Sequence, residues 1–105
     1  GDLRGAIEAF EEVFEKQPDW TLTRYALGSA YFFAGEYDNA AAAFRAALDK
    51  DPNNIDALSG LGSLEVKRKN LKEANKILEQ LKQKKADAAA AKLEQEIRLS
   101  GFKIK

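Results

Sequence analysis

One stretch of the sequence decides the fold: YALGSAYFFAGEYDNAAAAF, residues 25–44. Its composition is typical of helices, yet Gly28 lies within it, and glycine inside a helix costs ~1 kcal/mol relative to alanine. Phe32 and Phe33 are adjacent, and adjacent residues point about 100° apart around a helix axis. We therefore expect a helix whose glycine is compensated by close packing and whose surface is apolar on more than one side.

The composition narrows the possible functions. The chain has 105 residues, which suits one domain, and it is 45% hydrophobic and 32% charged, which favours a folded protein. It contains neither cysteine nor histidine, which removes thiolate and imidazole chemistry and the usual zinc ligands. We find no catalytic, cofactor-binding or metal-binding set of residues and expect no enzyme and no cofactor. The formal net charge of zero argues against a nucleic-acid partner.

The sequence also argues against insertion into a membrane. No apolar run approaches the ~20 residues that span a bilayer, and no signal-peptide pattern is present. We therefore expect a soluble chain. It begins with Gly1 and lacks methionine, so we also expect it to be a piece of a longer protein.

The sequence repeats itself with a period of 34 residues. Leu27 and Gly28 recur as Leu61 and Gly62. Three further residues recur at the same interval: Ala6 as Ala40, Phe10 as Phe44, and Pro18 as Pro52. Ala40 returns once more as Ala74, and Phe44 is followed at this interval by Leu78. Because unrelated residue types recur together, the pattern indicates a structural repeat.

These residues resemble the tetratricopeptide repeat, whose pattern is W-x2-L-G-x2-Y, then A-x3-F, then P. The best copy, residues 21–54, departs from the pattern at Arg24, where the family has an aromatic residue. The next copy has Glu65 in place of tyrosine and Ala86 in place of proline. The resemblance implies an all-α fold, a right-handed solenoid of antiparallel helix pairs with about six helices and a C-terminal capping helix.

The same resemblance divides the single expected domain, residues 1–105. Residues 1–20 form the second helix of a truncated repeat, 21–54 a full repeat, 55–86 a degenerate repeat and 87–105 the capping helix and tail. We expect helices over residues 3–16, 21–34, 37–49, 54–69, 71–84 and 87–99. Gly35 and Asn70 are expected to adopt left-handed turns, whereas Asn54 and Asp87 are expected to cap helices. The last two helices could also form one continuous rod.

The resemblance further implies a protein-interaction module that binds a peptide or helix on its concave surface, as a scaffold or assembly factor. Gly28 and Gly62 are expected to let paired helices approach closely. On a helical wheel of residues 21–34, the face opposite the paired helix carries the candidate partner-binding residues Leu22, Tyr25, Ser29, Phe32 and Phe33. The alternative is that Phe32 and Phe33 belong to the core.

A subset of the family binds terminal carboxylates with lysine and asparagine, but the matching positions here are Tyr25, Ser29, Ser59 and Ser63. We therefore expect apolar recognition, with Ser29, Ser59 and Ser63 adding hydrogen bonds. Ser59, Gly60 and Ser63 are expected to leave open space beside the aromatic residues, as a pocket for a partner side chain.

Charge and the first helix indicate a second possibility, self-association. Residues 1–53 carry ten acidic and five basic residues, net −5, and residues 54–105 carry seven acidic and twelve basic residues, net +5. This asymmetry is either a solvated surface or a basis for head-to-tail attraction or an acidic partner. Phe10, Val13 and Phe14 cannot all face the following helix. We expect them to pair with another chain or with an upstream helix of a longer protein.

Overall fold

The described part of the chain forms six helices. The computed structural model describes residues 3–17 and 21–103, with side chains over 4–17 and 24–100. The helices are α1 (Leu3–Lys16), α2 (Thr21–Phe33), α3 (Tyr37–Lys50), α4 (Ile55–Lys67), α5 (Leu71–Gln83) and α6 (Asp87–Lys103). The described residues contain no strand, and the expected all-α architecture is confirmed.

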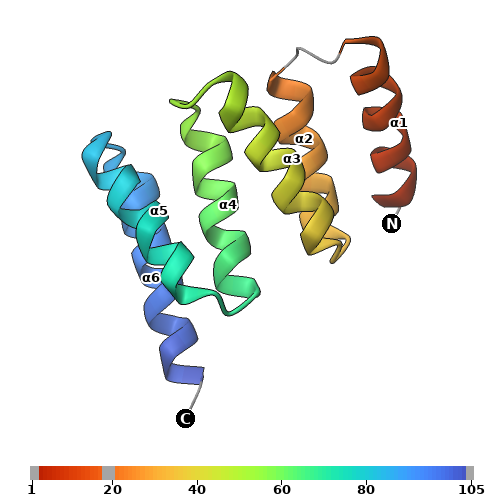
Figure 1. Ribbon diagram of the computed structural model, residues 1–105. Helices are drawn as coiled ribbons and strands as arrows, with labels where there is room; N and C mark the ends of the chain where they lie inside the picture. Colours follow the sequence, from red (N-terminus) through yellow and green to blue (C-terminus); the bar gives the residue numbers. More distant parts are fainter. Residues whose placement is uncertain (1–2, 18–20, 104–105) are drawn as a thin grey trace.

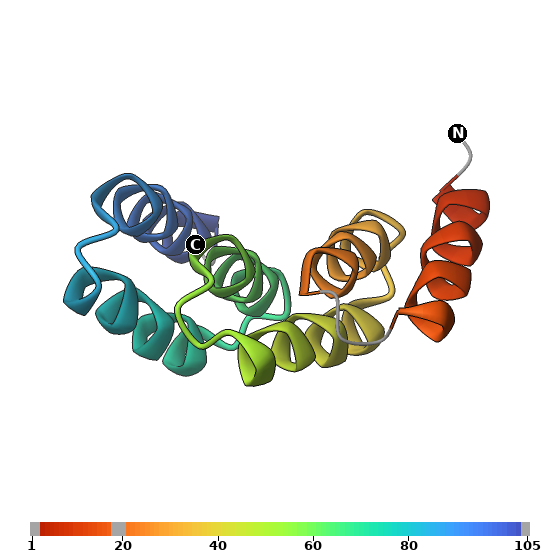
Figure 2. The same ribbon diagram turned by 90° about the horizontal axis from the view of Figure 1, so that it is seen from above.

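The helices form two layers that curve together (Figure 1). Seen from above, α1, α3 and α5 form an outer arc, and α2, α4 and α6 lie on its inner side (Figure 2). The helix pairs α2 with α3 and α4 with α5 pack directly against each other, and α6 packs on both α4 and α5. The fold is a solenoid of helix pairs, as the resemblance implied, and its inner layer is the surface on which we expected a partner.

Local sequence explains most helix ends. Gly35 follows α2 with φ +81°, the left-handed conformation that glycine adopts most easily. Asn54 precedes α4, and its side-chain oxygen accepts a hydrogen bond from the backbone N–H of Ala57 at 3.0 Å. Both expectations are confirmed. Pro18, on which the expected end of the first helix rested, lies outside the described residues.

Three boundaries differ from or refine the expectations. Asn70 is not the left-handed residue after α4, because Lys69 adopts that conformation with φ 61° and Asn70 has φ −96°. Lys69 follows Gly35 by one repeat, so the turn keeps its register and only the residue type changes. A turn with Lys85 at φ 60° separates α5 from α6, so the continuous rod is wrong. Asp87 lies within the first turn of α6 and not before it.

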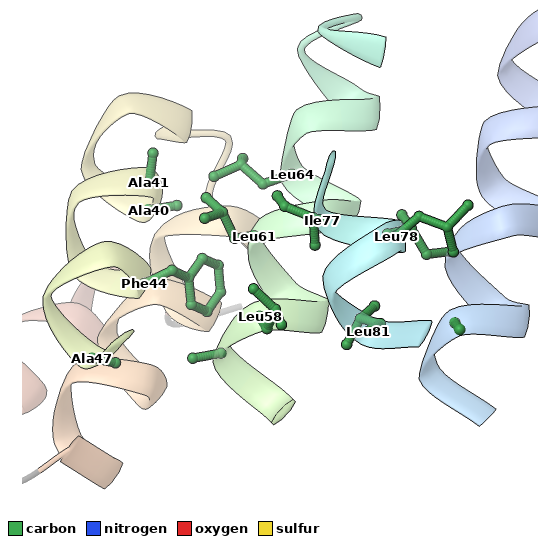
Figure 3. Packing of buried hydrophobic residues seen from close by; sticks show 13 residues of the cluster. Ala40, Ala41, Phe44, Ala47, Leu58, Leu61, Leu64, Ile77, Leu78 and Leu81 are labelled. Carbon is green, nitrogen blue, oxygen red and sulfur yellow. The ribbon is translucent and has the colours of Figure 1, made fainter. Parts of the chain in front are cut away.

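The main core joins α3, α4, α5 and α6, and its largest side chain is Phe44. Figure 3 shows the Phe44 ring pointing from α3 toward Leu58 and Leu61 of α4. A Cβ atom added to Gly28 of α2 would lie 2.7 Å from the ring, and one added to Gly60 of α4 would also lie 2.7 Å from it. Phe44 therefore fills the space that two glycines on neighbouring inner helices leave.

Gly62 is used in a different way. A Cβ atom there would lie 2.7 Å from Leu93 Cδ2 of α6 and 3.1 Å from Ile77 Cγ2 of α5. At both repeat glycines the nearest neighbours are side chains, so the close approach is between a helix backbone and a packed side chain. Ala40 and Ala74, which we expected on the partner helices, are fully buried.

A smaller core lies between α1 and α2, around Ile7, Leu27 and Ala30. Phe10 and Phe14 pack against it and are partly buried, while Val13 remains 37% exposed. The apolar face of α1 is thus mostly covered by α2. Among the described helices, none combines the length and the hydropathy that crossing a membrane requires.

Candidate functional site

The inner layer contains a pocket of about 360 Å³, which we call the inner pocket. It lies among α2, α4, the turn after α4, and α6. Its lining consists of Phe32, Ser63, Val66, Lys67, Lys69, Glu96, Leu99 and Ser100. This volume is at the lower end of the range for ligand pockets and suits a few side chains of a partner.

Each of the three inner helices contributes one apolar side chain to the inner pocket. Phe32 of α2 and Val66 of α4 are partly buried and stand 34 residues apart, so the repeat places them at equivalent points near their helix ends. Leu99 of α6 is 52% exposed. The Phe32 ring packs edge-on against Phe33 at 5.5 Å and lies 5.9 Å from the Tyr37 ring, contacts that hold it in place.

A hydrogen bond joins two walls of the inner pocket. The Ser63 hydroxyl of α4 donates to Glu96 Oε1 of α6 at 2.7 Å. This distance is short, as expected when the acceptor is a carboxylate. Ser63 therefore already has a partner within the chain, and Glu96 is the one acidic residue among the lining residues.

Two lysines complete the lining. Lys67 is the last residue of α4, and Lys69 follows in the turn before α5. Both are exposed, and the side-chain amine of neither makes a hydrogen bond or ion pair with any described part of the chain. Their amines are therefore available to a partner that enters the inner pocket.

Of the six candidate residues whose side chains the structure describes, the inner pocket brings together two, Phe32 and Ser63. Tyr25 is partly buried and lies 5.9 Å from the Phe44 ring, so most of it belongs to the core. Phe33 is outside the pocket but 72% exposed beside it. Ser29 and Ser59 are partly buried, and the Leu22 side chain lies outside the described part of the chain.

One expectation about this surface is wrong. Gly60 was expected to leave open space beside the aromatic residues, but the Phe44 ring of α3 occupies that space. The sequence did contain a signal for the residues that we missed. Val66 and Lys67 stand one repeat after Phe32 and Phe33, and Lys69 stands one repeat after Gly35. Val66, Lys67 and Lys69 all line the inner pocket.

Comparison with known protein families confirms the resemblance. The tetratricopeptide repeat family matches residues 32–97, which is more than half of the chain. The chain belongs to the tetratricopeptide repeat family. Such repeats are protein-protein interaction modules and are generally not catalytic, so the broad function of this chain is interaction with proteins.

A curated relative shows the same relationship over part of its length. The Protein CTR9 homolog of Arabidopsis thaliana is 39% identical over 64 residues. The match covers 61% of this chain but only 6% of the plant protein. The chain therefore spans only a small part of that relative's length.

A second hollow, of about 540 Å³, lies among α1, α2 and α3 of the tetratricopeptide array. Its polar groups are largely used within the chain. The Tyr31 hydroxyl donates to the Glu11 carboxylate, and burial together with this carboxylate raises the pKa of Tyr31 to about 12. Arg24 lies over the Phe14 ring at 5.1 Å and donates to the carbonyl oxygen of Ala46 at 3.2 Å. The inner pocket, with its two unpaired lysines, is the better candidate site.

The described residues also offer little for chemistry. They contain no group of three or more acidic, cysteine or histidine side chains that could hold a metal ion. Glu65 is the one buried charged side chain in that part of the chain, and it is paired with arginines. The inner pocket instead presents apolar and charged side chains.

Proposed function

We propose that this chain binds a peptide or helix of a partner protein in the groove formed by α2, α4 and α6, as a scaffold or assembly factor. The observation that carries this proposal is Phe33, which is 72% exposed beside the inner pocket. A large exposed aromatic side chain next to an apolar pocket is typical of interaction surfaces. Residues 1–105 act as one domain in this proposal, divided into the repeats described above.

The proposed contact surface has a centre and an edge. Phe32, Phe33 and Ser63 form the centre, since they line or adjoin the inner pocket. Tyr25, Ser29 and Ser59 are partly buried on the same inner helices and would contact the partner only with their exposed atoms. Leu22 remains a proposed contact at the beginning of α2.

Selection from a display library of random linear peptides tests this proposal. We expect selected peptides to bind the protein and to lose about tenfold or more in affinity to Phe33→Ser, because exposed aromatic residues often dominate such contacts. Val13→Ser is the matched control, since it removes an exposed apolar side chain from α1, away from the groove. Peptides that bind both variants as well as the parent protein would contradict the groove.

Self-association through α1 is the second candidate, and the exposure of Val13 favours it. Glu8, Glu12 and Glu15 are also exposed on this helix, at about 100° to 160° around its axis from Val13, so a basic second copy would complement the neighbouring face and not Val13 itself. Phe10 and Phe14 are partly buried and would add only part of their surface. Sedimentation over a concentration series tests this candidate. We expect Val13→Glu to abolish any dimer, and a parent protein that stays monomeric at low salt would exclude the contact.

A further inference from the structure

We propose that the inner pocket selects for acidic partners: an apolar side chain enters the pocket and an aspartate or glutamate beside it pairs with Lys67 and Lys69. This inference rests on the proposed function and specifies the chemistry of the partner. It assigns the specificity to the end of α4 and the following turn. These are not the positions that bind terminal carboxylates in other members of the family.

The first argument is the pairing of the basic residues. Several basic residues of the described chain form ion pairs with carboxylates: Arg45 and Arg68 pair with Glu65, and Lys16 pairs with Glu12. Lys67 and Lys69 make no such pair, yet both line the inner pocket. The side chains of Lys72, Lys85 and Lys92 also have no partner within the described part of the chain, but they lie outside this pocket.

The second argument is the balance of charge inside the pocket. Its lining contains two lysines and one carboxylate, Glu96, which already accepts a hydrogen bond from Ser63. The pocket lining therefore has an excess of positive charge beside the apolar side chains of Phe32, Val66 and Leu99. A partner carboxylate would gain charge-assisted hydrogen bonds there, whereas a partner lysine would be repelled.

The third argument is the backbone at Lys69. This residue has φ 61°, and the residue one repeat earlier, Gly35, has φ +81°. The turn thus favours glycine, and a lysine at this position costs free energy that glycine would avoid. The chain nevertheless has a lysine where the turn meets the pocket. Lys85 has φ 60° in the turn before α6, so the conformation alone does not define a site, and Lys85 provides a control.

The experiment uses a peptide selected from the random display library against the parent protein. We expect aspartate or glutamate to be enriched next to an apolar residue in the selected sequences. Lys69→Gly should weaken binding of such a peptide by about twofold to fivefold, the usual range for an exposed ion pair. Lys85→Gly removes the same charge, from a residue with nearly the same φ, and should leave the affinity unchanged.

A double-mutant cycle separates a direct ion pair from a general charge effect. Replacing the peptide's acidic residue by its amide should cost at least as much as Lys69→Gly, because the amide also loses the pair with Lys67, and the loss in the double variant should be smaller than the sum of the two single losses. Binding should also weaken in about 1 M salt, where the Debye length falls to roughly 3 Å.

The outcomes distinguish this inference from the function on which it rests. Selected peptides that depend on Phe33 but show no acidic preference and bind Lys69→Gly normally would overturn the inference and keep the proposed groove. A selection that yields no Phe33-dependent peptide would overturn both. Salt-sensitive dimers that lose their stability in Lys69→Gly would identify the acidic occupant as a second copy of the chain and would contradict a separate partner.

Discussion

Two helix junctions, each a side-chain hydrogen bond between neighbouring helices, occupy the same place in successive repeats. The donor and the acceptor are exchanged between them. At the first, the Tyr31 hydroxyl of α2 donates to the Glu11 carboxylate of α1. At the second, Arg45 of α3 donates to the Glu65 carboxylate of α4 at 3.3 Å. Glu65 follows Tyr31 by one repeat, and Arg45 follows Glu11 by one repeat. The acceptor has therefore moved from the earlier helix to the later one.

The comparison shows that this place in the repeat needs a polar bridge between helices and not a particular residue. The exchange buries a charged side chain: Glu65 is only 2% exposed, whereas Tyr31 is neutral and partly buried. Arg68 compensates further, lying 3.5 Å from Glu65 and 3.4 Å from Asp38. Glu65 thus replaces the family's tyrosine together with a matched set of arginines.

The largest expected effect comes from breaking the second junction. Arg45→Ala combined with Arg68→Ala leaves the buried Glu65 carboxylate unpaired and should lower the free energy of unfolding by about 3 kcal/mol, because an uncompensated buried charge is costly. The corresponding change at the first junction, Glu11→Ala, should cost about 1 kcal/mol or less. Urea unfolding followed by circular dichroism measures both changes.

Glu65→Leu in the double-arginine background provides the control. It removes the unpaired charge and should restore most of the lost stability. If the double-arginine variant is as stable as the parent protein, Glu65 does not depend on its partners and the comparison fails.

The next effect concerns the two repeat glycines. Gly28→Ala and Gly62→Ala share the same gain in helix propensity, ~1 kcal/mol, so their difference reports the local packing. At Gly28 the new Cβ meets the rigid ring of Phe44, and at Gly62 it first meets the end of the flexible Leu93 side chain. We expect Gly28→Ala to be less stable than Gly62→Ala by about 2 kcal/mol. Equal melting temperatures would show that Phe44 moves aside freely.

A smaller effect concerns the turns at Gly35 and Lys69. No atom lies within 4 Å of a Cβ added to Gly35, so Gly35→Ala tests the backbone conformation alone and should cost about 1 kcal/mol. Lys69→Gly should instead stabilise the fold by up to about 1 kcal/mol. Thermal unfolding of the two variants gives both values, and changes of the same sign would show that the turns are not equivalent.

The smallest effect is a pH dependence at the first junction. The pKa of Tyr31 is about 12, above its ordinary value of 10.0, chiefly because of burial and then because of the Glu11 carboxylate. The folded state therefore holds this proton more tightly, and the resulting stability is present below pH 10 and is lost as the pH rises from about 10 to about 12. Solvent screens the partly exposed hydroxyl and keeps the effect small.

Comparison of Tyr31→Phe with the parent protein tests this pH dependence. The parent's advantage in the free energy of unfolding should shrink through the same pH window. Tyr25→Phe, which removes another hydroxyl from α2, is the control. An advantage that stays constant to pH 12 would exclude the Tyr31 contribution.

Local sequence predicted the helices well because glycine, proline and capping residues act over a few positions. Gly35 and Asn54 behaved as expected, and the break after α5 was placed correctly. The error at Asn70 arose because residue preference was given more weight than the repeat. The period of 34 residues places Lys69, and not Asn70, at the position of Gly35.

The candidate site was harder to predict because it depends on how helices of neighbouring repeats pack against one another. A helical wheel puts Tyr25 and Phe33 on the same face, yet Tyr25 packs near Phe44 and Phe33 is exposed. The wheel describes one helix and omits the side chains that neighbouring helices insert against it. Leu99 reaches the inner pocket only because α6 packs against α4, which the sequence of α6 does not reveal.

The position of Phe44 also has a consequence for folding. Repeat arrays unfold cooperatively only as far as the contacts between neighbouring repeats hold them together. The Phe44 ring touches Gly28 in its own repeat and Gly60 in the next one, so neither repeat can open without uncovering the same ring. The α1–α2 core is a second cluster, joined to this one through the partly buried Tyr31. Residues 21–103 should therefore open as one unit in hydrogen exchange, with α1 exchanging first.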